Sequence, residues 1–187
     1  MIPWQAPLAS SPVHGHLVVP GSKSASARSL LLAALADGPS VLTGVLDSRD
    51  TTLMRAGLTA LGARFEDRSD GRVGVRPAEV LTGGGDIDCG LAGTVLRFLP
   101  PIAALAGAPT RFHGDAAAAA RPVAPLLDAL AVLGASVSEP RTLPFTVSGG
   151  PAFRGGRVSL DASASSQFVS ALLLAGARFP DGVTVHH

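Results

Sequence analysis

One lysine stands alone among the basic residues of this 187-residue chain. Lys23 is the single lysine, and the other fourteen of the fifteen basic residues are arginine. Its neighbours Gly21, Ser22 and Ser24 are small, so an anion can come close to it. A lysine ammonium is a compact point charge, which suits a phosphate or carboxylate held at short range better than a planar guanidinium does. A functional role for Lys23 and its chance survival in an arginine-rich chain are the two open interpretations.

Three segments rich in small and hydroxyl residues precede apolar stretches that predict helices, at residues 20–28, 90–97 and 161–167. The first amides of a helix have no partner within it and carry partial positive charge, so such an entry can bind an anion. Any one entry taken alone is equally well explained as an ordinary Ser or Thr cap. Three entries at equivalent places, with Arg28, Arg97 and Arg121 beside them, predict one pocket for a phosphorylated or carboxylated ligand.

The entries recur because the chain contains an internal repeat, which is the first pattern to seek in a sequence. Segment 28–44 is echoed by 97–114 and again by 168–185, and segment 58–63 matches 130–135. Arg49 and Arg121 are also 72 positions apart, and Gly62 and Gly134 are expected helix C-caps. Each unit therefore predicts the order strand, helix, strand, helix, strand, strand, which is an α/β fold.

The repeat divides the chain into an N-terminal tail, residues 1–15, and one partial domain, residues 16–187. The predicted units lie at about 16–80, 85–150 and 156–187, and the third stops at His187 after its first helix and the strand that follows. A repeat unit buries its apolar face against its neighbours, so a unit that stops halfway predicts a longer parent chain. A natural domain of two and a half units is the alternative.

Composition excludes several classes of protein. A net charge of +1 with scattered arginines gives no nucleic-acid footprint. The longest apolar stretch, residues 96–108, is too short for a membrane span, and the start of the chain has no signal-peptide pattern. With Cys89 as the only cysteine, no disulfide framework is expected, and a cytoplasmic location is predicted.

Metal and nucleotide sites are also not indicated. The histidines show no metal-ligand spacing with carboxylates or with the cysteine. Ser22 stands where a nucleotide-binding P-loop needs a glycine before the lysine. We therefore expect no metal ion and no cofactor.

Four motifs of the chain resemble those of the 5-enolpyruvylshikimate-3-phosphate synthase family. They are segment 19–24 with Arg28, segment 92–94 with Arg97, Arg121-Pro122 before segment 126–130, and segment 165–168. The likeness runs in order from about His16 to the end of the chain. The sister family of UDP-N-acetylglucosamine enolpyruvyl transferases has Lys-Asn where this chain has Lys23-Ser24.

The resemblance implies an inverse α/β barrel built of βαβαββ units, the third incomplete here, and a missing C-terminal half. It implies transfer of the enolpyruvyl group of phosphoenolpyruvate to the 5-hydroxyl of shikimate 3-phosphate, through a tetrahedral intermediate, without a metal or organic cofactor. Lys23, Gly93, Arg121 and Gln167 would bind phosphoenolpyruvate. Ser24, Arg28, Ser165, Ser166 and Gln167 would bind shikimate 3-phosphate, and Lys23 would be catalytic. The family's acidic proton-transfer residues would lie in the missing half, so this chain alone is expected to be inactive.

The chain also departs from the family pattern. Ala27 and Leu91 stand where the family usually has Asn, and segment 116–120 is all alanine where the family is usually charged. These changes leave the implied ligands in place and alter the polar groups around them. Two alternatives to an enzyme half stay open: a domain that binds a phosphorylated molecule without turnover, and an interaction domain whose helix entries are ordinary caps.

Overall fold

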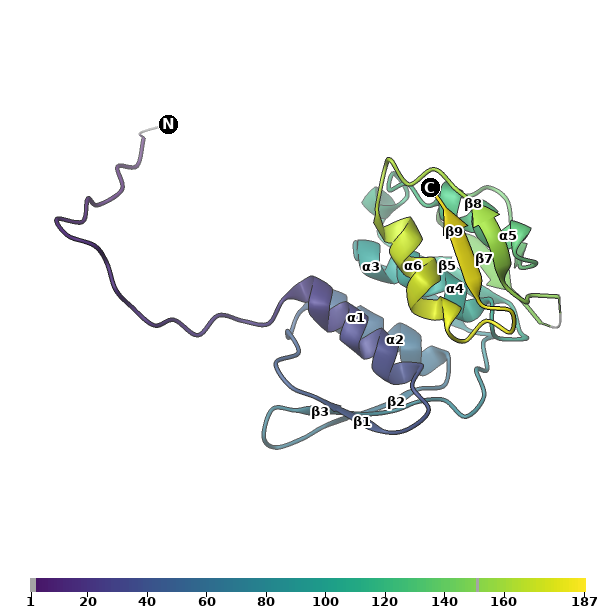
Figure 1. Ribbon diagram of the computed structural model, residues 1–187, viewed down its shortest axis with the longest axis horizontal. Helices are drawn as coiled ribbons and strands as arrows, with labels where there is room; N and C mark the ends of the chain where they lie inside the picture. Colours follow the sequence, from purple (N-terminus) through teal and green to yellow (C-terminus); the bar gives the residue numbers. More distant parts are fainter. Residues whose placement is uncertain (1–2, 151) are drawn as a thin grey trace.

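The computed structural model describes residues 3–150 and 152–187 (Figure 1). The helices are α1 (Lys23–Ala34), α2 (Arg49–Ala60), α3 (Gly93–Phe98), α4 (Pro100–Ala103), α5 (Ala124–Val132) and α6 (Gln167–Gly176), with a 3-10 turn η1 at Ala116–Ala118. The strands are β1 (Ser40–Leu42), β2 (Arg64–Asp67), β3 (Val73–Arg76), β4 (Asp86–Asp88), β5 (Thr110–His113), β6 (Ser136–Val137), β7 (Phe145–Ser148), β8 (Gly156–Ser159) and β9 (Val183–His186).

The strands form separate sheets that reproduce the predicted repeat. The strand order is β1-β3-β2 in the first sheet, β4-β5-β7-β6 in the second and β8-β9 in the third. Arg64 lies opposite Arg76 in the first sheet, and Ser136 lies opposite Ser148 in the second, each 72 positions later. The parallel pair β8-β9 corresponds to the parallel pair β4-β5. The structure therefore matches the predicted repeat in these strand pairs, down to the register of individual residues.

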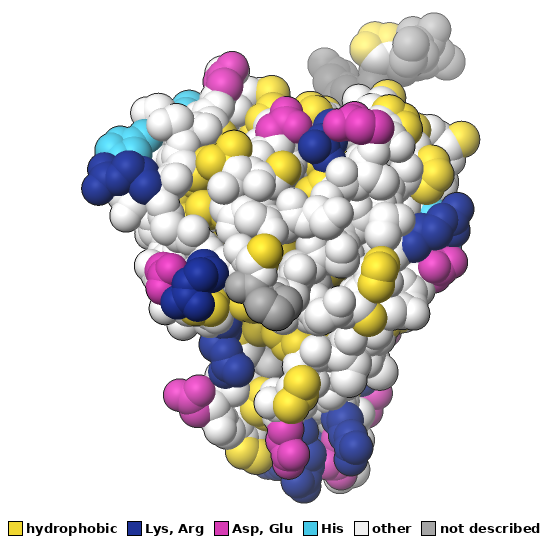
Figure 2. Space-filling view, turned by 90° about the vertical axis from the view of Figure 1, so that its right-hand side faces the viewer, with side chains coloured by type: hydrophobic (Ala, Val, Ile, Leu, Met, Phe, Trp, Pro, Cys, Tyr) yellow, Lys and Arg dark blue, Asp and Glu magenta, His cyan; other side chains and the backbone are white. Residues whose placement is uncertain are grey.

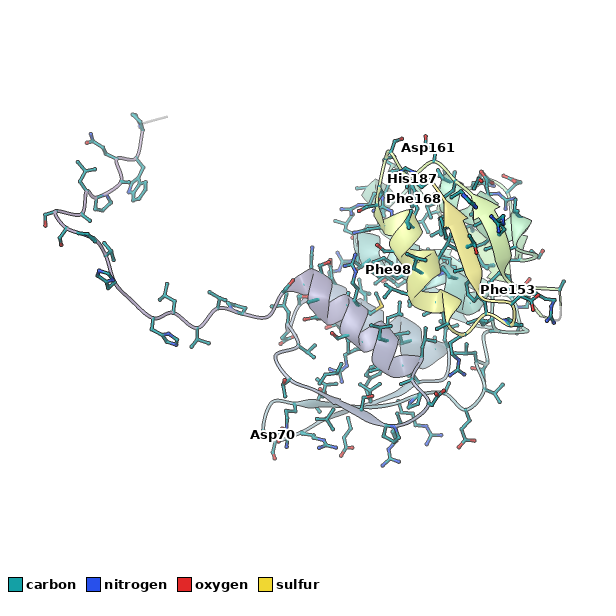
Figure 3. All side chains as sticks on the ribbon, in the orientation of Figure 1. Asp70, Phe98, Phe153, Asp161, Phe168 and His187 are labelled. Atoms are coloured by element: carbon teal, nitrogen blue, oxygen red, sulfur yellow. The ribbon has the colours of Figure 1, made fainter. Side chains whose placement is uncertain are left out.

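The helices lie inside and the sheets outside, as in an inverse α/β barrel. Helices α3 and α6 pack against each other, and α1 contacts both. Phe98 of α3 and Phe168 of α6 are fully buried, and each contacts an arginine of a neighbouring helix (Figure 3). Phe112 of β5 stacks on Phe145 of β7 at 5.0 Å, which extends the core into the second sheet. The helix entries predicted to bind an anion thus belong to helices that share one core.

The first unit lacks the leading strand that the repeat predicts. Residues 3–20 extend away from the body and contain no strand, and Leu17, Val18 and Val19 are exposed (Figure 1). A strand needs a neighbour to accept its backbone hydrogen bonds. Among the described strands, β1 pairs only with β3, so nothing holds residues 16–20 at its other edge.

The second unit also differs from the single apolar helix that the sequence predicts. Its first helix is divided into α3 and α4 at Leu99, because two prolines follow at positions 100 and 101. Leu99 itself keeps helical backbone, with φ of -84° and ψ of -29°, but proline has no amide hydrogen, so positions 100 and 101 cannot donate the helical hydrogen bonds to the preceding turn. The predicted caps are confirmed: Gly62 and Gly134 follow α2 and α5 with φ of 108° and 101°, values that favour glycine.

Within residues 3–150 and 152–187, no helix is both long and apolar enough to cross a membrane. Over the same residues, no three metal-ligating side chains gather where an ion could be held.

Cys89, directly after β4, is expected to be chemically inert in the folded protein. Its side chain is 1% exposed, and burial, with the Asp88 carboxylate beside it, raises the pKa of the thiol to about 12. The thiolate is the reactive form, and it is scarce near neutral pH when the pKa is that high. Iodoacetamide at pH 8 should therefore label Cys89 only after unfolding in urea. Rapid labelling under native conditions would contradict the burial of this residue.

Candidate anion-binding site

The first helix entry carries Lys23 and its partner. The Ser22 hydroxyl accepts a hydrogen bond from the Ala25 amide at 3.3 Å, which caps α1. The Lys23 ammonium lies 3.1 Å from Oδ2 of Asp50, in the first turn of α2. The Lys23 side chain is 59% exposed, so the ammonium keeps a free side for a ligand. This pairing of Lys23 with Asp50 was not foreseen from the sequence.

Ser24 and Arg28 lie one turn apart on α1 and contact each other. Arg28 donates from Nη1 to both the backbone oxygen and the hydroxyl of Ser24. Its guanidinium lies 4.9 Å from the centre of the Phe98 ring, a cation–π contact with α3. Arg28 is thus fixed between two of the three helices whose entries were singled out.

Gly93, Arg121 and Gln167 meet at the start of α3, although they come from three different segments. A β-carbon placed on Gly93 would lie 2.8 Å from Nη1 of Arg121 and 3.8 Å from Oε1 of Gln167. Because glycine has no side chain, the space over Gly93, between the Arg121 guanidinium and the Gln167 side-chain amide, stays open; we call this space the floor of the site. A small anion can approach both groups and the first amides of α3.

Arg97 contacts this cluster and is buried, with 8% of its surface exposed. It donates to Oε1 of Gln167 at 2.8 Å and, from two nitrogens, to the backbone oxygen of Pro122 at 3.2 and 3.0 Å. Its guanidinium also lies 5.4 Å from the centre of the Phe168 ring. These contacts join α3 to α6 and to the turn that carries Arg121.

The charge of Arg97 is not balanced by a carboxylate within the described part of the chain. Burial, and then the nearby Arg121, lower the pKa of Arg97 from its ordinary value, although arginine stays protonated in proteins. Two guanidinium groups without an acid beside them favour an anion at this place. The sequence indicated Arg97 only as a cation near the pocket. Its position in the repeat, which is equivalent to that of Arg28, was the signal that it could also hold other site residues in place.

The third entry, before α6, presents hydroxyl groups. The Ser165 hydroxyl accepts a hydrogen bond from the Gln167 amide at 3.2 Å. Ser166 occupies the N-cap position of α6, yet its side chain makes no capping bond. Since Oε1 of Gln167 accepts from Arg97, the amide nitrogen of Gln167 is the end left to donate to a ligand. The Thr94 hydroxyl at the start of α3 is buried and has no partner among the described residues.

The predicted residues therefore form two groups that are connected through α3. Lys23, Ser24 and Arg28 belong to α1, and Arg28 lies on Phe98. Gly93, Arg121 and Gln167 gather on Arg97, the neighbour of Phe98, and Ser165 and Ser166 adjoin Gln167. Both α1 and α6 begin on the side of the body from which the N-terminal segment leaves (Figure 1).

Repeated units with helices inside and sheets outside define a protein of the inverse α/β barrel class. The family model for EPSP synthase (3-phosphoshikimate 1-carboxyvinyltransferase) matches residues 8–187. The chain belongs to the EPSP synthase family.

Individual relatives agree with this assignment. The chain is 54% identical over 194 aligned positions to a 3-phosphoshikimate 1-carboxyvinyltransferase of Mycobacterium ulcerans (strain Agy99), covering 99% of this chain and 43% of the relative. It is also similar to two structures of EPSP synthase from Acinetobacter baumannii, each with a TM-score of 0.74 and 28% identity, covering 87% of this chain and 38% of theirs. The chain thus spans less than half the length of these relatives.

Proposed function

We propose that this chain binds shikimate 3-phosphate and phosphoenolpyruvate as part of an enzyme of chorismate biosynthesis. That enzyme transfers the enolpyruvyl group of phosphoenolpyruvate to the 5-hydroxyl of shikimate 3-phosphate. The observation that carries the proposal is the cluster of Gly93, Arg121 and Gln167 on a buried Arg97 that has no acidic partner in the described structure. A site with that charge suits a substrate that bears both phosphate and carboxylate.

The phosphoenolpyruvate subsite in this proposal is the open floor at Gly93. Arg121 offers a planar pair of donors that fits a phosphate or carboxylate in two hydrogen bonds. The Gln167 amide nitrogen adds a neutral donor whose direction is set by Arg97. The α3 amides complete the set of donors.

The shikimate 3-phosphate subsite consists of Ser24 and Arg28 on α1 and of Ser165, Ser166 and Gln167 at the start of α6. Arg28 supplies the charge for the phosphate, and the serine hydroxyls supply neutral hydrogen bonds. Lys23 lies at the start of α1 next to Ser24 and binds both substrates in the proposal. Its ammonium would stabilise the negative charge that develops in the tetrahedral intermediate.

The proposed reaction includes no metal ion or organic cofactor, and phosphoenolpyruvate supplies the group that is transferred. Proton transfer would rest on acidic residues in the part of the relatives that this chain does not cover. We therefore expect the 187-residue chain to bind ligand without turnover, and we place the enzyme in the cytoplasm.

Calorimetric titration of the chain with shikimate 3-phosphate tests the proposal. We expect weak binding that Arg28→Ala reduces by about tenfold or more, because charge-assisted hydrogen bonds contribute about 1.5–3 kcal/mol. Unchanged affinity in Arg28→Ala would show that the subsite is wrongly placed. Binding that persists without turnover after the chain is joined to the rest of a relative would favour the alternative, a binding-only domain.

Gly93→Ala should weaken phosphoenolpyruvate binding while the fold is kept. The added methyl would lie 2.8 Å from Nη1 of Arg121, so the guanidinium must move. Arg121 can move because the contact is at the end of a flexible side chain, and we expect about a tenfold loss of affinity with an unchanged melting temperature. Gly107→Ala is the matched control, since nothing lies within 4 Å of a β-carbon there. Equal affinities of the two variants would count against the subsite.

A further inference from the structure

The outer face of the first sheet carries arginines that lie close together. Arg64 of β2 and Arg76 of β3 are directly opposite each other in the antiparallel register. Directly opposed residues are about 4.5–5.5 Å apart at Cα, and like charges at that separation destabilise a sheet. Arg68 follows β2 on the same face, because side chains alternate along a strand and Arg64, Glu66 and Arg68 are two positions apart.

These three arginines have no ion-pair partner within residues 3–150 and 152–187, whereas their neighbours do. Arg55 pairs with Asp67 at 2.9 Å, and Arg72 pairs with Asp70. The two aspartates nearest in sequence are therefore already occupied. Glu66 is the only acid that lines the hollow, so the four side chains carry a net charge of +2. Charged side chains gather at this lower end of the molecule in Figure 2.

The internal repeat shows that the fold does not require this arginine pair. The equivalent positions of the second unit are Ser136 and Ser148, which occupy the same register in β6 and β7. Elsewhere on the second sheet, the exposed Arg111 lies 3.2 Å from Asp86 across the strands, so its charge is balanced. One unit thus forms the same strand pair without charge, and the other places two arginines opposite each other, neither of which forms an ion pair with a described residue.

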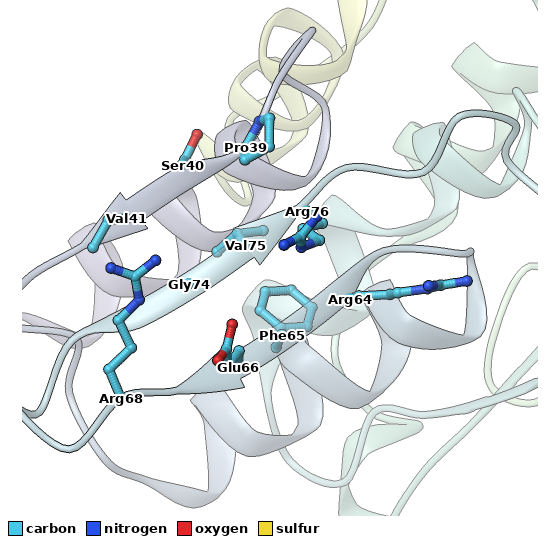
Figure 4. Close-up of a pocket in the computed structure, with 10 residues that line it drawn as sticks. All are labelled: Pro39, Ser40, Val41, Arg64, Phe65, Glu66, Arg68, Gly74, Val75 and Arg76. Carbon is cyan, nitrogen blue, oxygen red and sulfur yellow. The ribbon is translucent and has the colours of Figure 1, made fainter.

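A hollow of about 290 Å³ lies over Gly74, and the three arginines are among the residues that line it (Figure 4). Gly74 lies between the ends of the hollow, with Arg68 on one side and Arg64 and Arg76 toward the other. A β-carbon on Gly74 would lie 3.5 Å from Nε of Arg68 and 3.6 Å from Cβ of Glu66. Because glycine has no side chain, the space between Arg68 and Glu66 stays open and deepens the hollow. The exposed Val41 adds an apolar wall. This volume is at the lower limit of the range for small-molecule sites, about 300–1,000 Å³.

We propose that this hollow is a second ligand site, which binds a small molecule with two or more phosphate or carboxylate groups. Arg68 would bind one anionic group and the Arg64–Arg76 pair another, so that the ligand offsets the repulsion across the strands. Glu66 would accept a hydrogen bond from a hydroxyl or ammonium group in the middle of the ligand. None of these residues belongs to the proposed active site. An experiment can therefore disprove the second ligand site without disproving the proposed function, and the reverse.

The test is a titration of the 187-residue chain with citrate and, separately, with pyrophosphate, at constant ionic strength. Amide chemical shifts from ¹⁵N-labelled protein locate the binding. We expect saturable shifts at residues 64–76 and at Val41, and no shifts at the equivalent residues 136–148. Citrate binding alone would assign a carboxylate ligand, and pyrophosphate binding alone a phosphate ligand.

Arg64→Ser together with Arg76→Ser should lower the affinity at this site at least tenfold. This double variant copies the residues of the second unit, which shows that serines are compatible with this strand pair. Gly74→Leu keeps every charge but fills the hollow, and it should lower the affinity to a similar extent. Arg111→Ser removes one exposed arginine of the second sheet and should change nothing here.

Three outcomes would overturn the proposal. The first is the absence of saturable shifts at residues 64–76 with either probe. The second is unchanged affinity in the double serine variant. The third is a Gly74→Leu variant that binds as tightly as the parent, because binding would then reflect diffuse attraction to surface charge and not a site. Shifts confined to the surroundings of Arg97 and Arg121 would belong to the proposed active site and would count as the first outcome.

Discussion

Replacing Lys23 with Met should lower the turnover of a complete enzyme by about 100- to 1000-fold, which is typical when a group that stabilises transition-state charge is removed. The complete enzyme here is this chain joined to the remaining part of its Mycobacterium ulcerans relative. Lys23 is the single lysine and lies at the entry of α1 beside Ser24. The fold should survive, because an ion pair as exposed as Lys23 with Asp50 contributes at most about 1 kcal/mol.

Two further variants separate charge from shape at this position. Lys23→Arg keeps the charge, but the planar guanidinium is larger and cannot take the place of a compact ammonium between two anions. We expect it to lose most of the activity as well. Asp50→Asn removes the partner and leaves Lys23 in place, so it should affect turnover much less than Lys23→Met. An enzyme that tolerates Lys23→Met would exclude the catalytic assignment, and one that tolerates only Arg would show that charge alone matters.

Leu172→Ala should lower the free energy of unfolding by about 2.5–5 kcal/mol, the range for removing a fully buried leucine side chain. Leu172 lies on α6 with 0% of its surface exposed, in the core shared by α1, α3 and α6. The surrounding helices are held by further buried side chains and can close the resulting cavity only in part. Urea denaturation followed by circular dichroism gives the measurement.

The adjacent Leu173 provides a matched control on the same helix. Its side chain is 56% exposed, so Leu173→Ala should change the free energy of unfolding by no more than about 0.5 kcal/mol. The two variants remove the same atoms from neighbouring positions of one helix, so helix propensity is the same for both. Equal destabilisation by both would mean that α6 does not pack as described.

The sequence by itself was sufficient for the repeat and for most of the helices and strands of each unit. The 72-residue offset predicted which strands correspond, and the structure confirms it in the pairs Arg64–Arg76 and Ser136–Ser148. Gly62 and Gly134 were predictable as caps, because the backbone after a helix often needs a positive φ, which glycine adopts without strain. Such features depend on residues near one another in the chain, and residue type and spacing therefore determine them. The roles assigned to the site residues stay predictions, which the experiments above test.

The tertiary structure decided which of these residues meet. Gln167 is 70 positions from Arg97, and only the packing of α6 on α3 brings its oxygen to 2.8 Å from that guanidinium. The same packing buries Arg97 and leaves the floor at Gly93 open. Conversely, the leading strand that the repeat predicts for the first unit is absent, because residues 16–20 have no strand beside them in the described part of the chain. Contacts over such separations depend on how buried helix faces fit together, and no local pattern of residues specifies that fit.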